Sequence, residues 1–408
     1  MNRVIIIANN TYGKMMSGGD RIWIELTKNL AEKLNIVLFT SEEGLLLLNK
    51  SQETKVNISI IKTDTEFKDN NLYSILGLIK MQIRRTYKGI KYISANMGII
   101  KNSDFIYSSS DFYPDFLSAI FAKIINKKIK WIAGFYLFAT FPLSKNTPYK
   151  GINRVKGILY WFMQLPSYFI IKRFADYVFV TSEPDIKRFY SKKNNILKIL
   201  AIKGGIDISE SEKYLKSNDS VIPLDRREYD ACFVGRFHVQ KGCLELIDIW
   251  SNVNKKKKLK LVLIGDGELK HEIENKVAKL SMQSQIEILG FLDGKDKYEI
   301  FKQSKLMVHP AIYDSGGMAM AEGMAFGLPG ISFDLEALKS YYPKGVIKIP
   351  CFDIEAFANA IISLLENEKF YKELSKEAYE YAKTWDWSER ANYIYKQVFE
   401  KYDFQETY

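Results

Sequence analysis

Short apolar runs alternate along the chain with stretches in which apolar residues recur at helical spacing, such as 21–34. Such short β-branched or aromatic runs predict strands, and the stretches between them predict helices. The predicted strands of the first half are 3–9, 35–40, 57–63, 105–110, 129–138 and 176–182. Those of the second half are 229–237, 259–267, 286–292, 306–311, 329–334 and 346–350.

This dense strand–helix alternation predicts an α/β fold with doubly wound parallel sheets, each covered by helices on both faces. A chain of 408 residues is too long for one ordinary core. We therefore expect two Rossmann-like domains, 1–203 and 204–387, with the polar stretch 209–230 as the best candidate linker. Ligands are expected at the carboxyl ends of the strands.

Composition supports a globular protein, since 47% of residues are apolar and 26% are charged. No stretch reaches the roughly 20 apolar residues needed to span a bilayer. The apolar run within 1–10 is too short for a signal-peptide core and is interpreted as a first strand. Cys232, Cys243 and Cys351 are odd in number and lack metal-ligand spacing, which favours a reduced, cytoplasmic setting.

The net charge of +11 is concentrated in the first half. Residues 116–175 contain no Asp or Glu but 10 Lys or Arg and 14 aromatic residues, and 70–103 is also free of acids. This pattern fits either a solvated basic face beside core aromatics or a surface that meets phosphates or anionic lipid headgroups. No motif of a nucleic-acid-binding module accompanies it, so nucleic acid is not expected as a partner.

Two loops after predicted strands carry residues suited to phosphate. Gly18 and Gly19 stand just before a helical stretch, where a helix N-terminus attracts anions, although a plain turn explains them as well. Arg236 and Lys241 lie five residues apart between a strand and a helix. They are either solvated surface cations or a grip for a diphosphate, because cations at a helix start are unfavourable without an anion.

The loop 264–270 argues against a dinucleotide-binding protein. Gly265 and Gly267 begin a G-x-G-x-x-G pattern, but Lys270 stands where the third glycine belongs. The first predicted strand lacks the motif too, so a nicotinamide-dependent dehydrogenase is a poor fit.

The segment "YDSGGMAMAEGMAFG" places Asp314 and Glu322 eight positions apart around a turn and a helix start. Alone, each acid is as well explained by a helix cap or a solvated carboxylate. Together they flank the backbone amides of Gly316, Gly317 and Met318, which suit a phosphate. Hydroxyl acceptors at both ends and phosphate donors in the middle fit the shape of a sugar nucleotide.

With these motifs the chain resembles the retaining glycosyltransferases of family 4, also called glycosyl transferases group 1. The resemblance is strongest in "ACFVGRFHVQKG" and in "GFLDGKDKYEIFKQSKLMVHPAIYDSGGMAMAEGMAFGLPGISFD". It continues more thinly over the first half, in "SGGDRIWIELTKNLAEK" and "DYVFVTSEPDIKRF". It implies the GT-B fold, with an acceptor-binding and a donor-binding domain facing each other across a cleft. It also implies that a last helix, about 388–408, packs back on the first domain.

The resemblance implies a role for each motif residue. Arg236 and Lys241 would neutralise the donor diphosphate, Asp314 would contact the donor sugar, and Glu322 would hold the ribose. The remaining donor-binding positions it implies are Gly316, Gly317, Met318, Gly18, Gly19, Gly290 and Phe291, the last two beside the nucleobase.

Two departures from the family pattern are visible. Asp314 replaces the usual Glu and is shorter by about 1.5 Å, one carbon–carbon bond. The family often has a histidine in the middle of the first domain, whereas His238, His271 and His309 all lie in the second half. No catalytic role is therefore assigned to a histidine.

The implied activity is transfer of a sugar from a UDP-, GDP- or ADP-sugar to a glycan hydroxyl, with retention and without a metal or other cofactor. The basic, aromatic first half suits a lipid-linked or membrane-surface acceptor, with contact between residues 70–175 and anionic membrane at the inner face of the cell membrane. Alternatives are a non-catalytic sugar-nucleotide-binding or scaffold subunit, which would explain Asp314, and a sugar-nucleotide epimerase or hydrolase. A peripheral membrane protein without sugar chemistry leaves the motifs unexplained.

Overall fold

The computed structural model describes residues 1–400 except 14–15, 51–57, 67–73, 145–146, 150, 152–153, 191–197, 218–220 and 315. Parts of the segments 70–175 and 388–408 discussed above thus lie outside the described residues. The chain forms two compact units, one of Met1–Gly204 with Trp387–Tyr408 and one of Gly205–Asp386.

The first unit is built on a parallel sheet of seven strands in the order β3-β2-β1-β4-β5-β6-β7. These strands are β1 (Arg3–Ala8), β2 (Asn35–Ser41), β3 (Ile58–Asp64), β4 (Phe105–Ser108), β5 (Lys130–Gly134), β6 (Tyr177–Val180) and β7 (Lys198–Ala201). Sequence analysis missed β7, a short edge strand with no fully buried residue. The strand order reverses between β1 and β4, the position where such sheets bind ligands.

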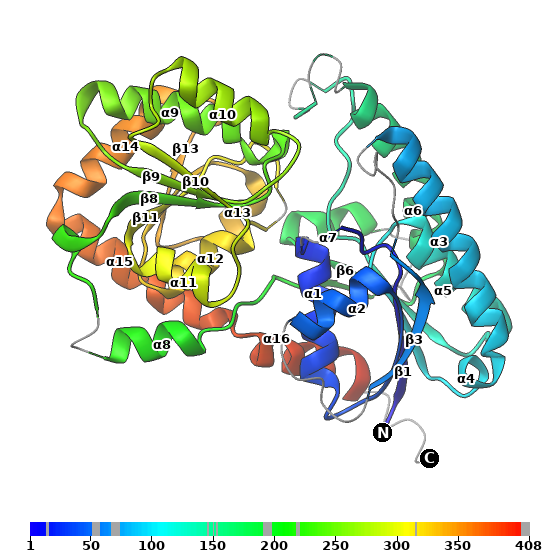
Figure 1. Ribbon diagram of the computed structural model, residues 1–408. Coiled ribbons are helices and arrows are strands. Elements are labelled where there is room, and N and C mark those ends of the chain that lie inside the picture. The colour runs from blue at the N-terminus through cyan, green and yellow to red at the C-terminus, as the bar shows by residue number, and fades with distance from the viewer. Residues whose placement is uncertain are drawn as a thin grey trace. The chain divides into compact units, whose positions relative to one another are not determined.

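Helices cover both faces of this sheet (Figure 1). They are α1 (Gly18–Leu30), α2 (Glu42–Lys50), α3 (Ile75–Ala95), α4 (Met97–Lys101), α5 (Tyr113–Ile125), α6 (Arg154–Phe174), α7 (Glu183–Phe189), α16 (Trp387–Ile394) and a π-helix, Tyr395–Glu400. The late segment joins this unit through side chains: Phe399 stacks edge-on against Phe105 with ring centroids 4.9 Å apart, and Lys33 donates to Asn392 over 2.7 Å.

The second unit has a parallel six-stranded sheet in the order β10-β9-β8-β11-β12-β13. Its strands are β8 (Tyr229–Val234), β9 (Leu261–Ile264), β10 (Ile286–Gly290), β11 (Ser304–His309), β12 (Gly330–Phe333) and β13 (Val346–Ile349). The order reverses between β8 and β11. The loops after these two strands therefore emerge side by side at the carboxyl edge of the sheet.

The helices of this unit also lie on both faces of its sheet (Figure 1). They are α8 (Ser209–Lys216), α9 (Cys243–Lys256), α10 (Lys270–Lys279), α11 (Lys295–Lys302), α12 (Met318–Ala325), α13 (Glu336–Tyr341), α14 (Ile354–Glu366), α15 (Glu368–Ala382) and three 3₁₀ turns, Leu224–Arg226, Val239–Lys241 and Lys383–Trp385. The prediction of two doubly wound parallel α/β domains is confirmed.

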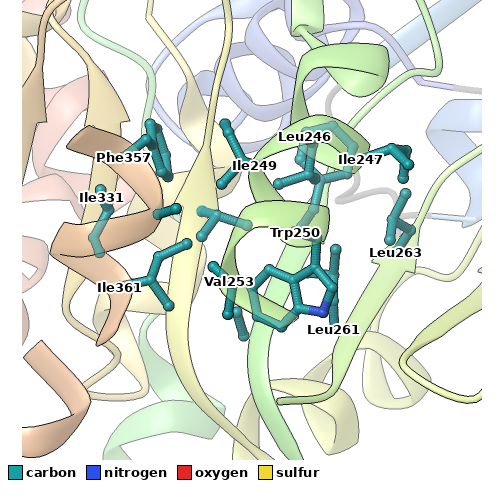
Figure 2. Packing of buried hydrophobic residues seen from close by; sticks show 14 of the residues in the cluster. Leu246, Ile247, Ile249, Trp250, Val253, Leu261, Leu263, Ile331, Phe357 and Ile361 are labelled. Carbon is teal, nitrogen blue, oxygen red and sulfur yellow. The ribbon is translucent and has the colours of Figure 1, made fainter. Parts of the chain in front are cut away.

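Trp250 anchors the core between the sheet, α9 and α14 (Figure 2). The side chain is fully buried in a cluster that also contains Leu246, Val253, Leu261 and Phe357, and its indole N–H donates to the Leu259 carbonyl over 3.3 Å. Burying each such side chain stabilises the fold by roughly 1.5–3 kcal/mol. This core holds the strands whose ends carry the site.

The predicted linker at 209–230 is wrong, because the second unit begins at Gly205 and β8 begins at Tyr229. Residues 209–216 form α8 inside the second unit, where Tyr214 is buried and its ring lies 6.1 Å from that of Phe326. The charged residues of α8 face solvent and give the segment a polar composition. The composition therefore did not indicate that Tyr214 packs near Phe326 and holds this helix in the second unit.

No helix among the described residues is both long enough and apolar enough to cross a bilayer.

Candidate active site

The loops after β8 and β11 meet through Lys241 and Asp314. The Lys241 Nζ lies 2.6 Å from Asp314 Oδ2. The backbones also touch, because a Cβ added at Gly242 would lie 1.9 Å from the carbonyl oxygen of Pro310. Gly242 has φ +65°, a left-handed conformation that favours glycine. The sequence thus permits the close approach that brings together two residues 73 positions apart.

His309, the last residue of β11, contacts the Asp314 carboxylate. Its side chain is 3% exposed, and its Nε2 is 3.0 Å from the same carboxylate oxygen that Lys241 contacts. Sequence analysis assigned no role to a histidine, and the structure places this one in contact with a predicted site residue. The signal that could have found it is its position at a strand end, five residues before Asp314.

Asp314 is held as a carboxylate. Burial raises its pKa, but the charge of Lys241 and the hydrogen bond and charge of His309 outweigh burial and hold the pKa well below the usual range. The group is therefore ionised at neutral pH and can accept hydrogen bonds.

Gly316 and Gly317 form a turn that leads directly into α12, as the sequence predicts. Gly317 has φ +60°, and a Cβ there would lie 3.0 Å from His309 Nε2. A Cβ at Gly316 would lie 2.9 Å from the ring of Tyr341, and the Tyr342 hydroxyl donates to the Gly317 carbonyl. The first amides of a helix have no carbonyl one turn back to accept their hydrogen bonds, and α12 begins at Met318. The Gly316 amide donates to Asp314 Oδ1 over 3.4 Å. These amides provide backbone donors beside Asp314.

Glu322 lies in α12 and pairs with Lys297 of α11, Nζ to Oε2 2.9 Å. Lys297 also lies 2.9 Å from Asp293, which follows β10. Neither Lys297 nor Asp293 was predicted from the sequence as a site residue. A lysine four residues before the buried Phe301, on the same helix face, is the signal that could have identified Lys297.

Gly290 and Phe291 end β10 and begin the loop that contains Asp293. Gly290 has φ +76° and open space around its Cα, and its carbonyl accepts from the Gly265 amide over 2.8 Å. Phe291 is 47% exposed, so an aromatic face is available beside this loop.

Arg236 follows β8 in the same loop as Lys241. Its backbone carbonyl accepts from the His238 amide over 2.8 Å, and its side chain is exposed to solvent. The structure thus places Arg236, Lys241, Asp314, the glycine turn, Glu322, Gly290 and Phe291 at the carboxyl edge of one sheet.

Gly18 and Gly19 belong to the other unit. They are the first two residues of α1 rather than residues before it, because Ser17 is the N-cap and forms a capping box with Asp20. A Cβ at Gly19 would lie 3.5 Å from the ring of Tyr136. This correction shifts the expected helix start by two residues.

A second polar cluster, missed by sequence analysis, lies where the strand order of the first unit reverses. The buried Asp115 carboxylate accepts from the amides of Asn9 and Asn10 and from the hydroxyls of Ser109 and Ser110, over 2.5–3.1 Å. Burial raises the pKa of Asp115 to about 7 even though these hydrogen bonds favour its ionised form. The cluster fixes the loops after β1 and β4.

Residues 216–381 match the family described as glycosyl transferases group 1. This matched segment lies within the second unit, in the part of the chain where the resemblance is strongest. These residues include every predicted site residue except Gly18 and Gly19.

Similar proteins include the amylovoran biosynthesis glycosyltransferase AmsD of Erwinia amylovora, 28% identical over 45% of this chain and 51% of AmsD. The poly(glycerol-phosphate) alpha-glucosyltransferase of Bacillus subtilis is 24% identical over 43% of this chain and 26% of its own length. The chain spans between about a quarter and a half of the length of the curated relatives it matches first.

Among solved structures, Anabaena HepE in complex with UDP and glucose superposes with a TM-score of 0.68 at 13% identity, over 98% of this chain and 100% of that one. This likeness extends over both units, and the fold is GT-B.

Proposed function

We propose that this protein is a retaining, metal-independent glycosyltransferase of family 4 that uses a nucleotide-diphosphate sugar. The observation that carries the proposal is the contact between Lys241 and Asp314, 2.6 Å, beside the glycine turn and within the matched segment 216–381. A cation and backbone amides suit a diphosphate, and a carboxylate suits sugar hydroxyls. Here these groups meet at the carboxyl edge of one sheet.

In this proposal the diphosphate binds between Arg236, Lys241 and the amides of Gly316 to Met318. The cations and amides stabilise the negative charge that develops as the bond between the anomeric carbon and the diphosphate oxygen breaks. The acceptor hydroxyl oxygen bonds to that carbon on the same face, and its proton passes to the departing phosphate. Arg236 and Lys241 supply the positive charge, and no step requires a metal.

Asp314 accepts hydrogen bonds from hydroxyls of the donor sugar, and Glu322 accepts them from the ribose. The low pKa of Asp314 supports this role because only the carboxylate is a pure acceptor. The shorter side chain also brings the sugar closer to Lys241 than a glutamate would. Gly290 and Phe291 border the nucleobase, and Gly18 and Gly19 are further donor-binding residues in this proposal.

The acceptor is proposed to be an anionic or lipid-linked glycan bound by the first unit, with the protein cytoplasmic and peripheral at the inner face of the cell membrane. The outer face of α6 supports this location. Val155, Phe162 and Phe169, spaced seven apart, are 57%, 60% and 62% exposed on a helix without an acidic residue. Exposed apolar side chains beside basic ones suit a membrane interface. The names of AmsD and of the Bacillus relative also point to polymer assembly.

The proposal is tested by turnover of UDP-, GDP- and ADP-sugars, with UDP-glucose first because HepE was solved with UDP and glucose. Wild type, Asp314→Ala and Glu322→Ala are compared with and without EDTA. Turnover of one donor that is lost in both variants and unaffected by EDTA is expected. Tight donor binding without turnover, even with a lipid-linked acceptor extract, would instead indicate the non-catalytic subunit. Loss of turnover in EDTA would refute metal independence.

A further inference from the structure

Lys297 is a buried lysine, with a side chain only 5% exposed. Lysine is almost never fully buried unless it is paired. It lies on the face of α11 that also buries Phe301, where an apolar residue would suit the core. The protein thus places a charge at an apolar position, and burying that charge is costly without compensation.

The compensation comes from two carboxylates in different segments. Asp293 lies in the loop after β10, and Glu322 lies in α12, each 2.9 Å from the Lys297 ammonium. Asp293 is 38% exposed and Glu322 17% exposed at their side chains. Lys297 therefore ties the loop that begins with Phe291 to the helix that carries Glu322.

An exposed pair on the same helix shows the contrast. Lys302 contacts Glu299 over 2.6 Å, but that carboxylate is 63% exposed. Such surface pairs contribute little, because water and salt screen them. The Lys297 pairs are screened less, so Lys297 restricts the orientation of Glu322 far more than Lys302 restricts that of Glu299.

We propose that Lys297 is a positioning residue that fixes the Glu322 carboxylate for the ribose hydroxyls of the donor and so makes the site selective for ribonucleotides. This inference rests on the proposed function, which assigns the ribose to Glu322. Because Lys297 holds the carboxylate before the nucleotide arrives, less ordering is left for binding to impose. Its loss removes the ammonium group that holds the Glu322 carboxylate and takes one positive charge away from Asp293 and Glu322 beside the nucleoside.

The experiment measures equilibrium binding of UDP, GDP and ADP, and of the 2′-deoxy and 3′-deoxy forms of whichever binds. The proteins are wild type, Lys297→Met, which keeps the chain length and removes the charge, and Lys302→Met as the matched control. Asp293→Asn serves as a milder second variant at a partly exposed side chain, in case Lys297→Met does not fold.

Wild type and Lys302→Met are expected to bind the ribonucleotide about tenfold more tightly than at least one deoxy form, a difference of about 1.4 kcal/mol. Lys297→Met is expected to lose that preference, with its deoxynucleotide affinity within about twofold of wild type. Asp293→Asn should reduce the preference in part.

A purely structural role for Lys297 would lower every affinity and the melting temperature together and preserve the ribose preference, which would overturn the inference. An unchanged preference in Asp293→Asn would overturn it if Lys297→Met does not fold. Failure of wild type to bind any of the three nucleotides would instead contradict the proposed function, and the inference with it. The two failures are therefore distinguishable.

Discussion

Gly242→Ala should disturb the candidate site through backbone contact alone. The new methyl group would lie 1.9 Å from the Pro310 carbonyl oxygen, and the residue would need φ +65°. The left-handed conformation costs about 1–2 kcal/mol in a residue with a Cβ, and the overlap adds about 1–3 kcal/mol as the loops separate. We expect a loss of roughly 2–5 kcal/mol in the free energy of unfolding of the second unit.

Gly327→Ala is the matched control, because Gly327 also has a positive φ, +77°, but an added Cβ would make only an ordinary contact, 3.5 Å from the Ser375 hydroxyl oxygen. It should lose only the conformational part, about 1–2 kcal/mol. Thermal unfolding of both variants beside wild type measures the difference, and donor binding reports whether Lys241 has moved from Asp314. If Gly242→Ala is no less stable than Gly327→Ala and binds donor equally well, the close approach of the two loops is wrong.

Two further predictions concern charge and surface. The depressed pKa of Asp314 means that its stabilising contribution is complete above its ordinary value of 3.8 and is lost as pH falls below that value. Wild-type melting temperature should thus fall more steeply than that of Asp314→Asn between about pH 4 and pH 2, and parallel profiles would contradict the pairing. Second, replacing Phe162 and Phe169 with serine should weaken binding to phosphatidylglycerol vesicles about tenfold or more. Phe370→Ser, at a residue 42% exposed on α15, should bind like wild type, and equal binding by all three would exclude α6 as the membrane contact.

Much of the fold follows from local patterns in the chain. Apolar runs such as 3–9 and 306–311 predicted strands because buried parallel strands require them. β7 was not predicted because it has only four residues, none of which is fully buried. The predicted linker failed at α8 because the burial of Tyr214 depends on Phe326, more than a hundred residues later.

The parts of the candidate site that lie within one short segment could be predicted from the sequence. The parts that depend on contacts between distant segments could not. Asp314 and the glycine turn could be identified from one segment. The roles of Lys297 and His309 depend on neighbours brought close by the sheet order and by the packing of α11 on α12. Charge type alone does not distinguish Lys297, buried between two carboxylates, from the many solvated lysines of this basic chain.

The central claim is that the pair of Lys241 and Asp314 forms the donor site, and one comparison tests it most directly. Lys276 and Asp248 form a pair of the same 2.6 Å length on the surface between α9 and α10. Turnover of the preferred donor is measured in EDTA for wild type, Lys241→Met and Lys276→Met. We predict that Lys241→Met lowers kcat by about 100-fold or more, because it removes a cation from the developing phosphate charge, whereas Lys276→Met matches wild type. Equal turnover by the two variants would contradict the account.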